Sequence, residues 1–129
     1  MALNLALDLN RYVDYANGVP EAVETVRGAS NVALPFVVLA ELRSGFRHGS
    51  RAEHNERRLG LFLQSNRVRV LFADEATTHL YAMIYAELRK IGRPIPTNDI
   101  WIAALVVQHD FVLFSRDRHF DRLPRVPRI

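Results

Sequence analysis

The sequence contains no cysteine, and this absence narrows the chemistry that the chain can perform. Disulfide bonds and thiolate metal sites are both excluded, so any bound metal must be held by oxygen or imidazole ligands. Glycine and proline are scarce, with six of each in 129 residues, and they form no linker or low-complexity tract. Because we also find no internal repeat, we expect a single domain over residues 1–129.

Long apolar runs are also missing. The stretch from Met1 to Leu7 is short, has no basic residues before it and ends at Asp8. It therefore predicts a buried strand and not a signal peptide or a membrane span. Hydrophobic residues make up 49% of the chain and charged residues 24%, which is typical of a globular domain. We expect a cytoplasmic protein.

Lysine is almost absent, because the chain has 17 basic residues and only one of them is lysine. The arginine guanidinium matches phosphate oxygens in pairs better than a lysine ammonium does. With a net charge of +3, the chain is suited to a polyanionic partner, and a solvated basic surface is the alternative interpretation. The last fourteen positions hold five arginines: Arg116, Arg118, Arg122, Arg125 and Arg128.

Apolar runs alternate with longer amphipathic patterns, which predicts an α/β fold of parallel strands joined by crossover helices. We expect strands at residues 3–7, 32–34, 68–72 and 112–115. We expect helices at residues 11–16, 20–28, 36–48, 50–65, 75–91 and 99–108.

Two of these helices carry further predictions. Ser50 and Glu53 have the spacing of a capping box at the start of the fourth helix. The helix at 99–108 is apolar on almost every side, so it should be central and buried. The segment from Pro124 onward is at most a short edge strand.

Four of the fourteen acidic residues stand where an unpaired charge is costly: Asp8, Glu41, Asp99 and Asp117. In open α/β sheets, side chains at strand ends and at the starts of the following helices converge outside the carboxyl edge. Asp8 closes the first predicted strand. Its structural alternative is a helix cap for the segment that follows.

Glu41 is the most informative of the four acids. Its helical neighbours three and four positions away are Val37, Val38, Ser44 and Gly45, so no cation can pair with it on its own face. Such a carboxylate must find a distant partner, shift its pKa or bind a cation. An ion pair with a distant arginine is the alternative.

Asp99 opens the buried helix, where the helix dipole favours the ionised form, so we expect a low pKa. Simple capping is the alternative, although Thr97 and Asn98 already supply cap groups. This redundancy favours a functional role for Asp99.

Asp117 follows the fourth predicted strand, and a turn aspartate is its alternative interpretation. Arg116 and Arg118 flank it and either neutralise it or hold phosphates beside it. Ser115 is a candidate supporting hydroxyl that orients a carboxylate or a metal-bound water. We expect His119 to be a loop residue and Trp101 to be part of the core.

Four carboxylates in one pocket require a compensating charge. Two like charges 4 Å apart repel by about 4 kcal/mol at an effective dielectric constant near 20. A hard divalent cation, Mg²⁺ or Mn²⁺, offsets this repulsion and takes oxygen ligands.

Four motifs in this order resemble the PIN domain, and more closely the VapC group of toxin ribonucleases. They are Asp8-Leu9-Asn10, Leu39-Ala40-Glu41-Leu42, Asn98-Asp99-Ile100-Trp101-Ile102-Ala103-Ala104, and Leu113-Phe114-Ser115-Arg116-Asp117-Arg118-His119-Phe120. The resemblance implies a three-layer α/β/α sandwich with a central parallel sheet. It also implies Mg²⁺- or Mn²⁺-dependent cleavage of RNA, a homodimer and a cognate antitoxin protein.

By matching positions, the resemblance makes Asp8, Glu41, Asp99 and Asp117 the catalytic, metal-binding quartet. Asn10 would be a supporting polar residue near the first acid. The family usually has a threonine between the first Asp and Asn, where this chain has Leu9. That departure removes a hydroxyl near the metal and leaves all four acids in place.

The chemistry that these residues favour is metal-assisted phosphodiester hydrolysis, with Arg116 and Arg118 as RNA contacts. A phosphatase with Asp8 as the nucleophile is one rival, but Asn10 occupies the position where that chemistry generally has a second aspartate. A catalytically weak or inactive RNA-binding module of the same fold is the other rival, and Leu9 is the only feature that favours it.

Overall fold

The computed structural model describes residues 2–129, and Met1 lies outside the described residues. Its centre is a four-stranded sheet with the order β3-β2-β1-β4, in which every neighbouring pair is parallel. The strands are β1 (Asn4–Leu7), β2 (Asn31–Pro35), β3 (Val68–Leu71) and β4 (Val112–Phe114). All four strands predicted from the sequence are present within one or two residues of the expected bounds.

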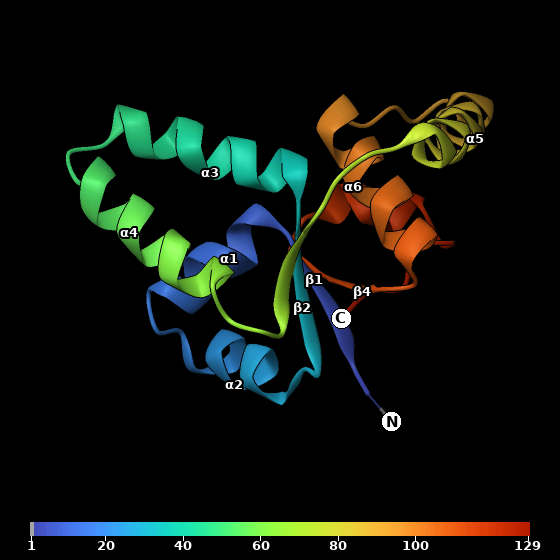
Figure 1. Cartoon of the computed structure of the whole chain (residues 1–129). Helices are drawn as coiled ribbons and strands as arrows, with labels where there is room; N and C mark the ends of the chain where they lie inside the picture. Colours follow the sequence, from blue (N-terminus) through green and yellow to red (C-terminus); the bar gives the residue numbers. More distant parts are fainter. Residues whose placement is uncertain (1) are drawn as a thin grey trace.

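Six α-helices and one 3-10 helix connect the strands. Helices α1 to α4 lie on one side of the sheet, and α5, α6 and η1 lie on the other (Figure 1). This arrangement confirms the expected three-layer α/β/α sandwich with a central parallel sheet. The helices are α1 (Leu9–Ala16), α2 (Pro20–Gly28), α3 (Phe36–His48), α4 (Ala52–Leu63), α5 (Glu75–Ile91), α6 (Thr97–His109) and η1 (Arg118–Arg122).

The core lies on both faces of the two central strands. Leu5, Ala6 and Leu7 of β1 have no exposed surface, because strands in a parallel sheet are covered on both faces. Residues 102–106 of α6 are equally buried, which confirms that this helix is central. None of the helices formed by residues 2–129 is long and apolar enough to cross a membrane.

The predicted capping box at Ser50 and Glu53 is wrong. Helix α4 starts one residue later than that box requires, with Arg51 as its N-cap and no side-chain cap bond. Glu53 therefore lies at the second helical position and not at the third, where a capping-box partner must be. A capping box does occur at the start of α5, where Asp74 and Thr77 bond to each other's backbone N–H groups.

The C-terminal segment lies against the outer edge of β4. Leu113 forms an isolated parallel bridge with Arg128, and its N–H donates to the carbonyl of Pro127 at 2.8 Å. This agrees with the prediction of at most a short edge strand. The contact covers part of the free edge of β4 and fixes the segment that follows η1.

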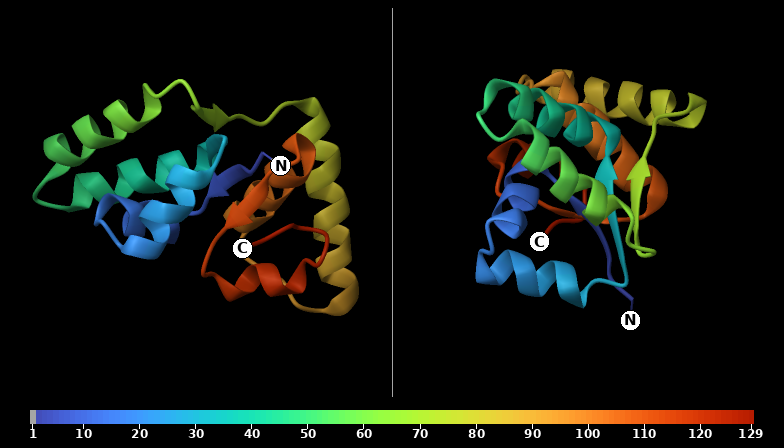
Figure 2. Two further views of the ribbon diagram at one scale, coloured as in Figure 1. Left: turned by 90° about the horizontal axis from the view of Figure 1, so that it is seen from below. Right: turned by 60° about the vertical axis from the view of Figure 1, so that its left-hand side comes forward.

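Helices α3 and α4 form an antiparallel pair, residues 36–63, which we call the α3–α4 hairpin. Its connecting turn projects beyond the sheet, as both views of Figure 2 show. Glu41 lies in the half of α3 near the sheet, and the turn between the helices carries Gly49 and Ser50.

Candidate active site

Asp8 stands between β1 and α1 and has two structural bonds. Its side chain is buried, with 5% of the residue exposed. One carboxylate oxygen accepts the Leu9 N–H at 2.8 Å, and the other accepts the Ser115 hydroxyl at 2.6 Å. The helix-cap interpretation of Asp8 therefore holds, but capping uses only one of its two oxygens.

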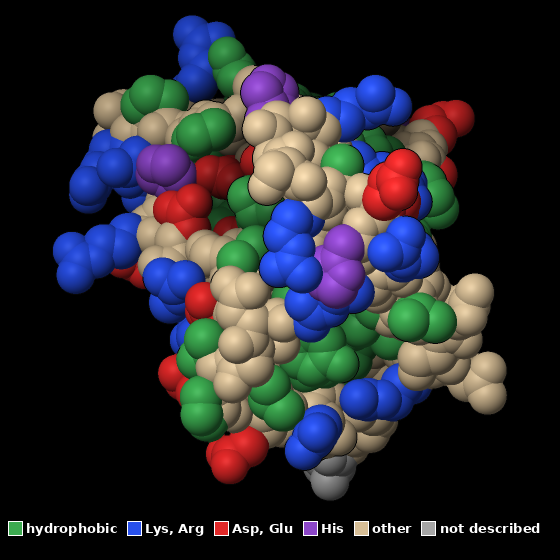
Figure 3. Space-filling model, turned by 90° about the vertical axis from the view of Figure 1, so that its left-hand side faces the viewer, with side chains coloured by type: hydrophobic (Ala, Val, Ile, Leu, Met, Phe, Trp, Pro, Cys, Tyr) green, Lys and Arg blue, Asp and Glu red, His purple; other side chains and the backbone are tan. Residues whose placement is uncertain are grey.

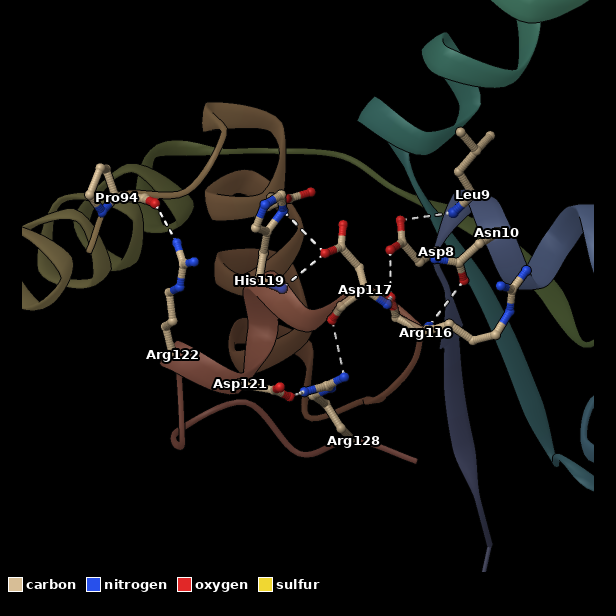
Figure 4. Close-up of polar contacts among 12 residues, drawn as sticks. Asp8, Leu9, Asn10, Pro94, Arg116, Asp117, His119, Asp121, Arg122 and Arg128 are labelled. Carbon is tan, nitrogen blue, oxygen red and sulfur yellow. Dashed lines mark hydrogen bonds and ion pairs between the residues drawn. The ribbon is translucent and has the colours of Figure 1, made fainter.

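Ser115 links Asp8 to the segment that carries Asp117. Its Oγ donates to Asp8 and accepts the backbone N–H of Asp117 at 3.0 Å. The hydroxyl thus joins two groups that are 109 positions apart in the sequence. Figure 4 shows the Asp8 and Asp117 carboxylates on the same side of this junction, pointing toward a shared space.

His119 bridges the two remaining aspartates of this region. Its Nδ1 lies 2.9 Å from Oδ2 of Asp99 and 3.1 Å from Oδ1 of Asp117. Asp117 also caps η1 by accepting the His119 backbone N–H at 2.9 Å. His119 is therefore in contact with two of the four predicted site acids. The expectation that it is only a loop residue is wrong.

Burial raises the pKa of Asp99 above its ordinary value, and the nearby charges of Asp117 and Asp8 raise it further. The hydrogen bond from His119 opposes this change without cancelling it. The low pKa predicted from the helix dipole is therefore wrong, because desolvation of a buried carboxylate outweighs the dipole. Neither Thr97 nor Asn98 caps α6, which begins after Pro96 with no side-chain cap bond.

Glu41 lies on α3 with no ion pair to any residue in the described part of the chain, 2–129. Burial raises its pKa, and the charges of Asp8 and Asp99 add to the effect, while the Asn98 side chain opposes it. The alternative of a distant arginine partner is therefore wrong. Glu41 is held near the other acids without a compensating cation.

The four acids share one electrostatic environment. Burial is the largest cause of the raised pKa of Asp8, with a contribution from the charge of Asp117. Glu41 is influenced by all three aspartates. Such mutual repulsion at the carboxyl edge of a sheet fits a bound divalent cation, since carboxylate oxygens are its preferred ligands.

The donor geometry is also suited to a metal ion. Asp99, Asp117 and His119 each offer one ligand atom, and these three atoms all lie within 4.8 Å of one another. Oxygen donors with one imidazole suit Mn²⁺ well and Mg²⁺ through the carboxylates. The residues present therefore fit the metal ion that the resemblance implies.

The two arginines beside Asp117 have different surroundings. The Arg116 guanidinium donates to both carboxylate oxygens of Asp14, at 3.0 and 3.1 Å. The Arg116 backbone N–H donates to Oδ1 of Asn10 at 3.2 Å, so Asn10 supports the loop and not Asp8 directly. Arg118 is exposed, and its side chain has no hydrogen bond or ion pair within residues 2–129.

The hydrogen bond between Leu9 and the site is made by the Leu9 backbone. The group that bonds to Asp8 is the N–H of residue 9, which every residue except proline provides. The Leu9 side chain is half-buried and packs against the core. The departure from threonine therefore leaves this bond unchanged.

Comparison with known proteins gives consistent matches. The model of the PIN domain family matches residues 9–126, and so begins directly after Asp8. Ribonuclease VapC4 of Mycobacterium tuberculosis is 34% identical over 90 residues, which cover 70% of this chain and 69% of that protein.

Two solved structures have the same fold. VapBC2 from Rickettsia felis, bound to a DNA fragment from its promoter, superposes with a TM-score of 0.87 at 24% identity, covering 98% of both chains. VapBC-5 from Mycobacterium tuberculosis, a member of the VapBC family of toxin–antitoxin systems, gives a TM-score of 0.73 at 25% identity. That match covers 100% of this chain and 98% of the other.

Proposed function

The chain belongs to the PIN domain family, and we propose that it is a metal-dependent endoribonuclease that serves as the toxin of a toxin–antitoxin pair. The observation that carries this proposal is the convergence of four carboxylates, three of them with raised pKa values, without an arginine or lysine partner among residues 2–129. The relative named a ribonuclease and the toxin–antitoxin neighbour support the same class of activity.

In this proposal, Asp8, Glu41, Asp99 and Asp117 hold Mg²⁺ or Mn²⁺, and His119 is a further candidate ligand. A cation bound there would supply a water of lowered pKa and would stabilise charge that develops on the phosphate. The charge and repulsion of the four acids are the features that select a cation over a neutral ligand.

The surrounding residues fix the carboxylates. Ser115 and the Leu9 N–H hold both oxygens of Asp8, so its orientation is set before any ligand arrives. The Nδ1 atom of His119 contacts one carboxylate oxygen of Asp99 and one of Asp117, and so fixes the two side chains beside each other. Such preorganisation keeps the reorganisation needed for catalysis small. Arg118, exposed beside Asp117, is proposed to contact an RNA phosphate.

Cleavage of a labelled single-stranded RNA in Mn²⁺, Mg²⁺ or chelator tests the proposal. We expect cleavage only with a divalent cation, and a loss of about 10³-fold or more in Asp8→Asn and Asp99→Asn. Glu24→Gln, which removes an exposed acid of α2 with no contact to the site, is the matched control. Full activity in chelator, or in Asp8→Asn, would refute the mechanism.

An inactive RNA-binding module would bind RNA without cutting it under all these conditions. Leu9 keeps the backbone bond to Asp8 but lacks the threonine hydroxyl, so RNA cleavage itself decides between the two alternatives.

The antitoxin, the homodimer and the cytoplasmic location are part of the same proposal. We expect growth arrest when the chain is expressed in a bacterial host, and none with Asp8→Asn. The molar mass of the purified chain measured by light scattering tests the homodimer. A monomeric chain that arrests growth would remove the dimer from the proposal and leave the nuclease.

A further inference from the structure

Two short segments each carry a net charge of +3, residues 116–128 near the C-terminus and residues 43–58. Residues 43–58 contain five arginines and two glutamates, a net of +3, which equals the net charge of the whole chain. The other residues carry twelve cations and twelve anions. Residues 43–58 form the outer half of the α3–α4 hairpin, which projects from the sheet (Figure 1).

The C-terminal arginines, in contrast, are mostly engaged within the molecule. Arg116 binds Asp14, Arg122 donates to the Pro94 carbonyl at 2.7 Å, and Arg125 pairs with Glu87. Arg128 donates to Asp121 and to the Asp117 carbonyl. Four of the five arginines near the C-terminus therefore already have partners.

Three arginines of the hairpin are exposed and unengaged. Arg43 pairs with Glu56, and Arg58 donates to the Ala16 carbonyl. The side chains of Arg47, Arg51 and Arg57, which we call the hairpin arginines, form no hydrogen bond or ion pair with any residue that the structure describes. Basic side chains project at the margin of the surface on this side of the molecule (Figure 3).

The hairpin arginines border two open hollows. One, of ≈ 570 Å³, lies between α3 and α4 and is lined by Arg47 and Arg57. The other, of ≈ 460 Å³, lies at the turn and is lined by Arg51 and Arg57. The pKa of His54 in the second hollow is lowered, by desolvation and by the surrounding arginines. Glu53 lines both hollows and Glu56 lines the first, but arginines outnumber glutamates in each, so both hollows offer a net positive charge to an anionic ligand.

The hairpin leads directly to the acids. Glu41 and Arg47 are on the same helix, six residues or about 9 Å apart along its axis. We propose that the hairpin arginines bind backbone phosphates of the RNA strand whose scissile bond lies at the four acids. This inference rests on the proposed ribonuclease function and adds a substrate-binding surface to it.

Salt-dependent binding tests the proposal. The probe is a fluorescent single-stranded RNA of about a dozen nucleotides, and its anisotropy is followed in chelator, so that it is not cut. The test variant is Arg47→Gln/Arg51→Gln/Arg57→Gln. Each phosphate contact contributes about 0.7 to the slope of log affinity against log salt for single strands, so we expect the slope to fall by about 2.

The matched control is Arg27→Gln/Arg89→Gln/Arg93→Gln, which removes the same charge from exposed positions outside the hairpin. We expect its slope to stay near that of the unmodified chain. Equal losses in both variants would overturn the proposal, because net charge alone would explain binding. An unchanged slope in the hairpin variant would also overturn it.

Two further measurements separate a failure of the proposed ribonuclease function from a hairpin surface that binds protein. Cleavage by the unmodified chain with Mn²⁺ reports on the proposed function itself, so its absence would remove that function whatever the binding data show. Competition by polyglutamate of similar length tests an acidic protein as the ligand. If the hairpin variant loses polyglutamate binding but keeps RNA binding, the surface serves a protein and the RNA proposal fails.

A second inference comes from the contacts of Asp14 on α1, which lie outside the α3–α4 hairpin. The Asp14 side chain, 16% exposed, accepts two bonds from Arg116 and one from Arg11 at 3.3 Å. Arg116 lies between Ser115 and Asp117, and its backbone N–H is held by Asn10. Helix α1 thus holds the loop that carries two groups of the site. We infer that Asp14 is a positioning residue that acts through Arg116.

Titration calorimetry with Mn²⁺ tests this role, which also rests on the proposed function. We expect Asp14→Asn to weaken Mn²⁺ binding about tenfold, as loss of a supporting contact commonly does, and Asp14→Glu to recover part of it. Glu21→Gln is the control, because Glu21 contacts Arg11 but not Arg116. Arg116→Gln should match Asp14→Asn, and the double variant should add nothing further.

A lower melting temperature with unchanged Mn²⁺ affinity in Asp14→Asn would make the residue merely structural and overturn the inference. Absence of Mn²⁺ binding by the unmodified chain would instead refute the proposed metal site.

Discussion

Replacing Ser115 with alanine would remove the hydroxyl that joins Asp8 to the Asp117 backbone. The hydroxyl is buried and makes two bonds, at 2.6 and 3.0 Å. A hydrogen bond to a charged group contributes about 1.5–3 kcal/mol to stability, and a neutral one about 1 kcal/mol. Because Asp117 is partly exposed and its N–H can gain water, we expect Ser115→Ala to lower the free energy of unfolding by about 2–3 kcal/mol.

The effect should depend on pH. The bond from Ser115 lowers the pKa of Asp8, so it stabilises the ionised carboxylate. Its contribution is present above the folded-state pKa of Asp8 and is lost as the pH falls through that value. The difference between Ser115→Ala and the unmodified chain should therefore be larger at pH 7 than in mild acid.

Urea denaturation in chelator, at pH 7 and in mild acid, measures the difference in the free energy of unfolding between Ser115→Ala and the unmodified chain. Thr78→Ala is the control, because its exposed hydroxyl bonds only to the Glu75 carbonyl of its own helix. In thermal unfolding at pH 7, we expect the melting temperature of Ser115→Ala to fall by about 4 °C for each kcal/mol of stability lost. A loss no larger than in Thr78→Ala would refute the reasoning, as would a loss that is the same at both pH values.

Three other predictions follow from the same contacts. Glu41→Gln should stabilise the metal-free chain at pH 7 and reduce the rise in melting temperature that Mn²⁺ gives, because it removes a repelled charge; destabilisation without metal would contradict this. In chelator, the raised pKa values of Asp8, Glu41 and Asp99 should make stability fall as the pH rises above their ordinary values of 3.8 and 4.5, since the folded chain then binds more protons than the unfolded chain. The free energy of unfolding, measured from pH 4 to 7, should fall less with pH in Glu41→Gln. An identical profile in the two chains would show that the raised pKa of Glu41 does not cause the fall. Asp74→Ala removes the capping box of α5 and should cost about 1 kcal/mol in chemical denaturation without slowing RNA cleavage; a slower enzyme would place Asp74 in the site.

Elements with strong local signals were predicted closely from the sequence. The bounds of α2, α3 and α5 agree with the structure, since a first-turn Pro20 and a following Gly92 mark where two of them begin or end. Gly92 has the positive φ of 67° that favours glycine after a helix. The sequence predicts the start of α6 two residues late, because Pro94 and Pro96 indicate a loop, whereas Pro96 serves as the N-cap of the helix.

The site was predictable only in part. The positions of the acids at strand ends follow from parallel-sheet topology, which any βαβ pattern indicates. The contact of His119 with Asp99 depends on how η1 packs against α6, and no local sequence pattern predicts this packing. The pKa of Asp99 depends on the depth of its burial, which the sequence does not contain. The pairing of Arg116 with Asp14 spans 102 positions and is likewise a property of the fold.

The pairing of the first strand with the last has a consequence for protein synthesis. Because β1 pairs with β4 and Asp8 bonds to Ser115, a nascent chain cannot bring its four acids together until residues 112–117 have left the ribosome. At about 5–20 residues per second, this delay lasts on the order of ten seconds. A polypeptide whose translation stops before β4 would carry three of the four acids and lack the Ser115 hydroxyl that holds Asp8. The order of elements along the chain thus makes the assembly of the four acids a late step of synthesis.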